Sequence, residues 1–173
     1  ELDVVRRDDP LSLLKEICAK MYDAFDYVPE STAVDSPIDD ALRSRQGVCQ
    51  DFTHIMLALL RPLGIPARYV SGYLYSHVGE TRSTPGASHA WVEALLPGLG
   101  WIGFDPTNNL IANEHHIRVA IGRDYADVPP TRGIFKGKAE TELSVSVRVT
   151  RADEPPAEDT AVPAHWAALG EKD

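Results

Sequence analysis

Residues 88–107, "SHAWVEALLPGLGWIGFDPT", contain the pattern that most restricts how this chain can fold. Two apolar and aromatic runs, 88–96 and 100–107, flank the turn-forming residues PGLG. Such a pattern predicts two strands joined as an antiparallel hairpin. Further strands are expected at 67–76, 116–122 and 141–149, the last because its apolar residues alternate strictly with polar ones. The chain is therefore expected to build an antiparallel sheet.

Helices are expected before this sheet. Residues 10–25 carry apolar side chains at helical spacing after Asp9-Pro10, which is a good start signal. A second helix is expected from about Cys49 to Arg61, followed by Pro62 and Gly64, and a short one over 37–44. Helices followed by consecutive hairpin-like strands make an α+β domain with an antiparallel sheet.

The composition places this domain within residues 1–150. After Thr150 the sequence becomes acidic and rich in alanine and proline, so 151–173 is expected to be a mobile tail. The net charge of -9 argues against nucleic acid or an anionic membrane as the main partner, since both bind basic surfaces. The two cysteines form neither a disulfide framework nor a zinc motif, which favours a reducing, cytoplasmic setting. The start, "ELDVVRRDDP", suggests a segment excised from a longer chain.

Cys49 lies where a glycine-marked turn, "RQGVC", becomes an apolar helix. The first turn of a helix has free N–H groups and a partial positive charge. These groups favour a thiolate, and they can also receive an oxyanion that forms on a substrate carbonyl. Gly47 permits close backbone approach there. Taken alone, a cysteine at a helix start is more often a structural residue, so both interpretations stay open at this point.

A thiol nucleophile needs a base, and the base needs an orienting partner. His89 begins the first strand of the predicted hairpin, directly after the loop residues "TPGAS". Asp105 ends the second strand, so the hairpin brings the two side chains within reach of each other. Asp105 would then bind one ring nitrogen of His89 and leave the other facing the thiol.

Three blocks, "GVCQDF", "SHAWVE" and "GWIGFDPTNN", occur in this order and together resemble the transglutaminase-like superfamily. More narrowly, the chain resembles the bacterial transglutaminase-like cysteine peptidase branch, in which "ARYVSGYL" and "RGIFKG" also have counterparts. The resemblance covers roughly residues 10–150. It implies a papain-like fold, with Cys49 as nucleophile, His89 as base and Asp105 as carboxylate. Proteins of this branch commonly carry a β-rich domain ahead of this one.

The resemblance identifies the residues that would stabilise an oxyanion less completely than it identifies the nucleophile, base and carboxylate. All three tryptophans follow Cys49, so the upstream tryptophan that serves animal transglutaminases has no equivalent. That role would fall to backbone N–H groups near Cys49, with Tyr27 or Gln46 as candidate helpers. Additional candidates for the cleft are Gln50, Asp51 and Trp91, although polar helix-start and core positions explain them equally well. Trp91 and Trp101 either shield the His–Asp pair from water or pack in the core.

The resemblance implies cysteine-dependent acyl transfer at an amide bond of a protein or peptide, with hydrolysis favoured over amine transfer. No cofactor is expected, because the calcium loops of animal transglutaminases have no counterpart. "NEHH", with Glu114, His115 and His116, lacks a third ligand at suitable spacing, so no metal is expected. His54 is expected at the surface or half-buried. The alternative is a catalytically silent binding or assembly module that kept the fold.

Overall fold

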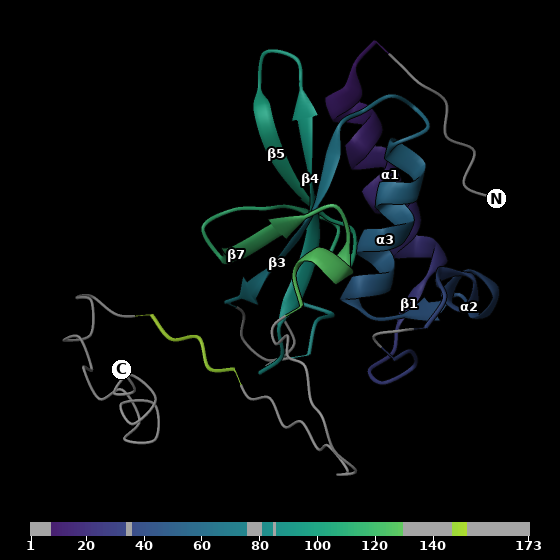
Figure 1. Ribbon diagram of the computed structural model, residues 1–173, viewed down its shortest axis with the longest axis vertical. Helices are drawn as coiled ribbons and strands as arrows, with labels where there is room; N and C mark the ends of the chain where they lie inside the picture. Colours follow the sequence, from purple (N-terminus) through teal and green to yellow (C-terminus); the bar gives the residue numbers. More distant parts are fainter. Residues whose placement is uncertain (1–7, 34–35, 76–80, 85, 130–146, 152–173) are drawn as a thin grey trace, which may run out of the picture.

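Figure 1 shows the computed structural model, which describes residues 8–33, 36–75, 81–84, 86–129 and 147–151. A five-stranded sheet with the strand order β6-β5-β4-β3-β7 lies at its centre, and every neighbouring pair in it is antiparallel. The strands are β3 (Ala67–Leu74), β4 (His89–Leu96), β5 (Gly100–Asp105), β6 (Leu110–Ile111) and β7 (His116–Gly122). The expected antiparallel sheet is therefore confirmed.

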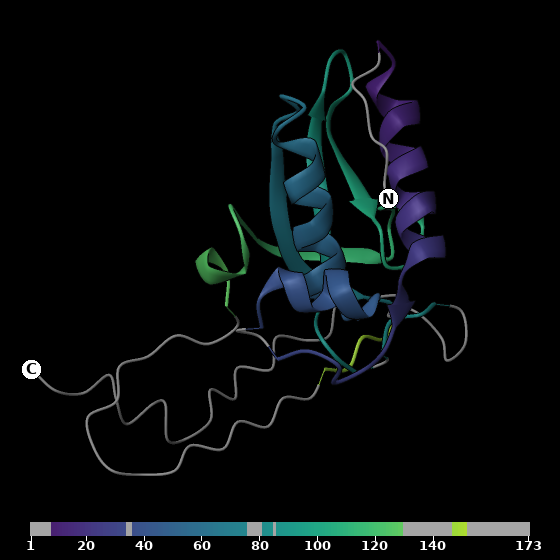
Figure 2. The same ribbon diagram turned by 90° about the vertical axis from the view of Figure 1, so that its right-hand side faces the viewer.

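Helices α1 (Pro10–Ala24) and α3 (Cys49–Leu60) cover one face of this sheet, as the two views in Figures 1 and 2 show. The short helix α2 (Ile38–Ser44) packs against α3, and β1 (Asp26–Tyr27) pairs in parallel with β2 (Gln46–Gly47). A 3-10 turn, η1 (Tyr125–Asp127), follows β7. All three predicted helices are present, and the α+β class is confirmed.

The hydrophobic core lies between the sheet and the two long helices. Alternate residues of β4 face the helices and are buried, and these are Ala90, Val92, Ala94 and Leu96. Asp9 caps the start of α1 by accepting a hydrogen bond from the Ser12 N–H at 3.2 Å. Burial of these apolar faces fixes α3 against the middle of the sheet, and it therefore fixes where the first residue of α3 lies relative to β4.

The predicted hairpin is formed by β4 and β5, whose turn contains Gly98 and Gly100 at φ +73° and +77°. Glycine adopts such left-handed backbone at little cost, which explains the PGLG sequence. Trp101 differs from both expectations made for it. It is 42% exposed, because it points to the helix-free face of the sheet, where the Arg68 guanidinium lies 4.0 Å above its ring.

The strand predicted over 141–149 is not found in its described part. Residues 147–149 are not in a strand, and the Val147 N–H donates to the Gly86 carbonyl in a loop instead; residues 141–146 lie outside the described ranges. The tail beyond 151 lies outside them too, so the boundary predicted at residue 150 remains a prediction. Within the described parts of the chain, no helix is both long and apolar enough to cross a bilayer.

Candidate active site

Cys49 is the first residue of α3, and a compact turn sets its position. The buried Asp51 carboxylate holds this turn, because its Oδ2 accepts from the Val48 N–H at 2.8 Å and from the Thr32 hydroxyl at 2.5 Å. Gly47 makes the close approach possible, since a Cβ there would lie 2.9 Å from Asp51 Cβ and Oδ2. This geometry leaves the Cys49 N–H at the start of the helix, where no carbonyl of the helix can accept from it.

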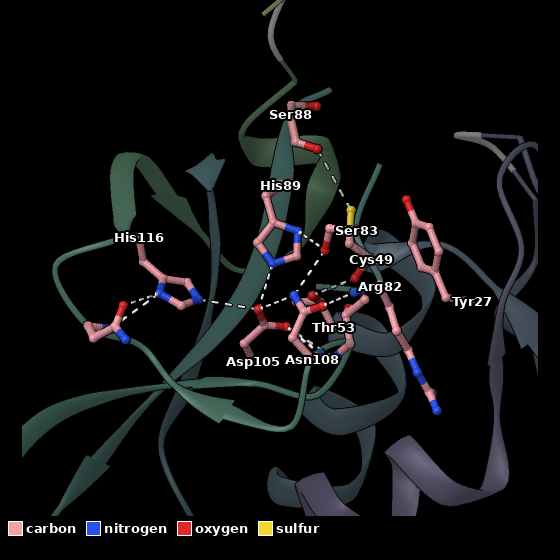
Figure 3. A network of polar contacts seen from close by, with 12 residues as sticks. Tyr27, Cys49, Thr53, Arg82, Ser83, Ser88, His89, Asp105, Asn108 and His116 are labelled. Atoms are coloured by element: carbon pink, nitrogen blue, oxygen red, sulfur yellow. Dashed lines mark hydrogen bonds and ion pairs between the residues drawn. The ribbon is translucent and has the colours of Figure 1, made fainter. Parts of the chain in front are cut away.

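The Cys49 side chain is half-buried and faces the first residue of β4. Its Sγ lies 4.0 Å from the Ser88 carbonyl oxygen, and Figure 3 shows the sulfur and the ring of the next residue, His89, in one polar network. The Thr53 hydroxyl donates to the Cys49 carbonyl at 2.7 Å and so holds the first turn of the helix. The thiol therefore lies beside a histidine at the end of a neighbouring strand.

His89 and Asp105 form a buried pair across the hairpin. The last pair in the register of β4 and β5 is Val92 opposite Phe104. Continuing this register by one residue places Asp105 opposite Trp91, so His89, two residues before Trp91, is a diagonal neighbour of Asp105 on the same face of the sheet. His89 Nε2 lies 2.8 Å from Asp105 Oδ2, and the two side chains are 2% and 0% exposed. With Nε2 directed to the carboxylate, Nδ1 is the ring nitrogen on the other side, where the thiol lies (Figure 3).

Several donors satisfy the buried Asp105 carboxylate. Oδ1 accepts from the N–H groups of Thr107 and Asn108 at 3.0 and 3.3 Å. Oδ2 accepts from Asn108 Nδ2 at 2.7 Å and lies 3.2 Å from Nε2 of a second histidine, His116. Burial alone would raise the pKa of Asp105, but His89, His116 and Asn108 outweigh it and lower that pKa well below its usual range.

The same pair sets the protonation of His89. Burial lowers the pKa of His89, but the charge and hydrogen bond of Asp105, together with Cys49, outweigh burial and raise that pKa above its usual value. The negative carboxylate therefore stabilises an imidazolium at this position. A histidine that can hold a proton next to a thiol is the arrangement that proton transfer from sulfur requires.

The loop 81–84 contacts the His89 ring at Nδ1, the nitrogen that faces away from Asp105. The Ser83 hydroxyl lies 3.3 Å from His89 Nδ1 and accepts from Asn108 Nδ2 at 2.9 Å. Arg82 anchors this loop: its backbone N–H donates to Asn108 Oδ1, and its guanidinium donates to the carbonyls of Tyr22 and Phe25. The loop thus joins the end of α1 to the histidine.

A cleft of about 330 Å³ opens over the thiol. Its walls are mostly apolar and aromatic, and it is lined by Tyr27, Pro29, Glu30, Val48, Cys49, Gln50, Tyr69, Ser71, Thr84, Ala87, Ser88, His89 and Ala90. The Tyr27 hydroxyl spans the cleft to Thr84, with 3.0 Å to Oγ1 and 3.2 Å to the Thr84 N–H that donates to it. Two predicted cleft residues, Tyr27 and Gln50, therefore lie beside Cys49.

Three other predicted cleft residues do not line this cleft. Gln46 is exposed in β2, because its pairing with Asp26 directs this segment along the outside of the molecule. Asp51 is buried beneath the turn that it caps. Trp91 is buried behind the histidine, and its ring stacks on His89 at 6.0 Å between centroids and 28° between planes. Trp91 therefore packs against the His89 ring from the core of the protein.

Sequence reasoning missed three residues of this network, namely Ser83, Asn108 and His116. Asn108 lies within the "FDPTNN" block, and the sequence could have indicated it because amide side chains suit the turn after a strand. From the sequence, His116 stands out only as a possible metal ligand within "NEHH". Its pairing with Asp105 depends on the path of residues 109–115, which no local pattern predicts. His54, expected at the surface or half-buried, is half-buried and accepts from the Tyr125 N–H.

His89, Asp105 and His116 are the described residues that could be considered for a metal, since their ligand atoms lie within 4.8 Å of one another. The 2.8 and 3.2 Å separations of the two Nε2 atoms from Oδ2 are those of hydrogen bonds. A shared carboxylate oxygen accounts for both imidazoles, so we assign the three side chains to a hydrogen-bonded network.

The layered α+β fold, with a cysteine at the start of a central helix and a histidine on the adjoining strand, is that of papain-like cysteine enzymes. The sequence model of the family described as the transglutaminase-like superfamily matches residues 3–106. The chain belongs to this superfamily.

Relatives and solved structures agree with this assignment. A protein of Mycobacterium leprae is 48% identical over 130 residues, which are 73% of this chain and 45% of that protein. A crystal structure named a "Putative Cysteine Protease" from Cytophaga hutchinsonii matches with a TM-score of 0.64 and 33% identity over 82% of this chain and 47% of that one. A protein-glutamine gamma-glutamyltransferase of Pseudomonas aeruginosa is 34% identical over 88 residues, 49% of this chain and 13% of that protein. The chain thus spans about half the length, or less, of these relatives.

Proposed function

We propose that this domain transfers acyl groups from amide bonds through Cys49, and that water is the usual acceptor. The observation that carries this proposal is the buried contact between His89 Nε2 and Asp105 Oδ2 at 2.8 Å. It directs the Nε2 proton to the carboxylate and leaves Nδ1 to take a proton from sulfur. Asp105 acts as the orienting partner that a histidine base requires.

The reaction begins when His89 Nδ1 takes the proton of the Cys49 thiol. The sulfur attacks the amide carbonyl carbon, a sulfur–carbon bond forms, and the carbonyl oxygen becomes an oxyanion. The Cys49 N–H and the partial positive charge of the α3 start stabilise this oxyanion. The carbon–nitrogen bond then breaks as His89 returns the proton to the departing amine. Water, deprotonated by the same histidine, attacks the thioester and releases the carboxylic acid and the thiol.

Hydrolysis is favoured because the thiol is only half-buried and its cleft opens to solvent, which gives water direct access. Substrates are expected to be protein or peptide, since the cleft walls offer apolar and aromatic surface to a side chain. The named activity of the Pseudomonas aeruginosa relative makes amine transfer the second candidate. In that case a primary amine replaces water at the thioester.

A glutamine-containing peptide tests both outcomes, with and without a fluorescent primary amine. Cys49→Ala and His89→Gln should lower product formation by about a thousandfold or more, because each removes a reacting group. His115→Gln serves as the matched control, since His115 is exposed and its ring contacts Tyr75. Both routes release one ammonia for each thioester formed, so ammonia release that exceeds amine incorporation supports hydrolysis, and incorporation that equals ammonia release would refute it.

The silent binding module is the remaining alternative, and it predicts an ordinary thiol at Cys49. Iodoacetamide labelling distinguishes the two, because a thiol activated by His89 reacts well below neutral pH and an ordinary one does not. Cys18 does not interfere, since it is buried and burial raises the pKa of its thiol to about 12. Equal rates for Cys49 and free cysteine below pH 7 would favour the binding module.

A further inference from the structure

His116 is a second histidine on the carboxylate that orients His89. Its Nε2 lies 3.2 Å from Asp105 Oδ2, the same oxygen that His89 Nε2 contacts at 2.8 Å. The His116 side chain is 1% exposed, so water does not compete for this contact. Figure 3 shows the carboxylate between the two rings. One carboxylate oxygen therefore serves two buried imidazoles.

The surroundings of His116 favour a proton on its Nε2. His116 Nδ1 lies 3.2 Å from both the Asn113 backbone N–H and Asn113 Oδ1, so it accepts from the N–H in the neutral ring and donates to Oδ1 in the imidazolium. In both states Nε2 carries a proton that is directed at Asp105. The ring also packs edge-on against Trp91, with centroids 5.3 Å apart at 75°. His116 is thus held as a hydrogen-bond donor to the carboxylate.

We propose that His116 is a positioning residue that shares Asp105 Oδ2 with His89 and thereby weakens the hold of the carboxylate on the His89 imidazolium. This proposal rests on the proposed function of Cys49 and His89. A donor to a carboxylate stabilises its negative charge and reduces its attraction for other partners. A base that must also return its proton to the leaving amine works best when it holds that proton moderately. His116 provides this moderation.

The titratable groups with the largest effect on His89 are Asp105 and Cys49. Asp105 acts from β5 and Cys49 from α3, while the loop 81–84 contributes the uncharged Ser83. Against His116 pack Asp105, His89, Trp91 and Asn113. A change at His116 is therefore transmitted to His89 mainly through Asp105.

The sign of the expected effect separates this role from simple packing. Without the His116 donor, more carboxylate charge acts on His89, so the imidazolium and its partner thiolate persist to lower pH. The pH at which Cys49 alkylation reaches half its maximum should fall by about one unit. If His116 only kept the loop in place, its loss would disorder His89 and move this midpoint upward, toward that of a free thiol.

The experiment measures the iodoacetamide rate at Cys49 from pH 4 to 10 by mass spectrometry of the labelled peptide. His116→Phe keeps a ring against Trp91 but has no donor, and it should lower the midpoint by about one unit. His116→Gln restores an amide donor and should return the midpoint to that of the parent protein. His115→Phe is the neighbouring control and should leave the midpoint unchanged.

Each outcome decides between the proposals. An unchanged or raised midpoint in His116→Phe, with circular dichroism that shows a folded protein, overturns the role of His116 and leaves the proposed function standing. If the parent protein itself labels no faster than free cysteine at acidic pH, the proposed function fails and the role of His116 fails with it. A lowered midpoint in His116→Phe that His116→Gln reverses supports the proposal.

Discussion

Asp105→Asn is the most informative single substitution, because the structure determines how the new amide must lie. The N–H groups of Thr107 and Asn108 both donate to the Oδ1 position, so the amide oxygen of an asparagine must occupy it. The amide NH₂ then takes the Oδ2 position, where it faces His89 Nε2 and leaves Asn108 Nδ2 and His116 Nε2 without their acceptor. His89 responds by accepting at Nε2 and placing its proton on Nδ1. In this tautomer Nδ1 cannot take the proton of Cys49.

The size of the effect follows from the lost charge. Two unit charges 2.8 Å apart attract by about 6 kcal/mol at an effective dielectric constant of about 20. At about 1.4 kcal/mol for each factor of ten, the complete loss corresponds to roughly four orders of magnitude in rate. The rearranged hydrogen bonds recover part of this energy, so we expect kcat to fall about a thousandfold to ten-thousandfold with little change in KM.

The assay is ammonia or amine release from the glutamine peptide, in parallel with iodoacetamide labelling of Cys49. Labelling of Asp105→Asn near pH 6 should fall toward that of free cysteine, because its imidazolium no longer has a buried counter-ion. A variant that is folded, keeps its acidic labelling and loses less than tenfold in kcat would refute the reasoning. That result would mean that His89 is oriented without the carboxylate.

Two other predictions concern stability. Gly47→Ala brings a Cβ to 2.9 Å from Asp51, so it should lower the free energy of unfolding by about 1–3 kcal/mol and slow Cys49 labelling. In Gly98→Ala nothing lies within 4 Å of the new Cβ, so this variant should lose only about 1 kcal/mol of unfolding free energy for its left-handed backbone and leave labelling unchanged. Equal labelling losses in both would contradict the role of the Gly47 turn. Because the pKa of His89 is raised in the folded protein, His89 contributes stability that is fully present below its pKa in the unfolded chain, near 6.5. This contribution is lost as the pH rises through the pKa of the folded protein, so urea unfolding should show stability falling above about pH 7. Asp105→Asn should flatten this part of the curve, and an unchanged slope would count against the pair as its cause.

Much of the fold follows from local patterns in the sequence. The helix starts and ends, the PGLG turn and the alternation of β4 all have short-range causes, so they can be predicted. The segment 141–149 shows the limit of such reasoning, because alternation indicates a strand only where a partner strand is available. Instead of pairing with a strand, the described Val147 donates its N–H to the Gly86 carbonyl in a loop. Trp101 illustrates a related limit, since its residue type favours burial but its side chain lies on the helix-free face.

The site was predictable to the extent that its residues are tied to element ends. Cys49, His89 and Asp105 each begin or end an element that the sequence predicts, and the hairpin register then brings two of them together. His116 also begins a predicted strand, but β7 pairs with β3 and not with β5. Its distance from Asp105 is set by the connection that crosses from β6 to β7, which has no periodic pattern. Long-range placement of this kind depends on the packed sheet.

The two halves of the site are built differently, and this difference bears on the choice of acyl acceptor. The His89–Asp105 half is buried and has fixed donors on both carboxylate oxygens, so it can serve hydrolysis and amine transfer equally well. In the proposed reaction the acceptor approaches from the Cys49 half, where the cleft is open and Tyr27 bonds across it to Thr84. Weakening that bridge widens access to the thioester without touching the reacting groups. Tyr27→Phe should therefore alter the ratio of amine incorporation to hydrolysis while leaving iodoacetamide labelling of Cys49 unchanged. A change in labelling at a constant ratio would instead mean that Tyr27 acts on the thiol.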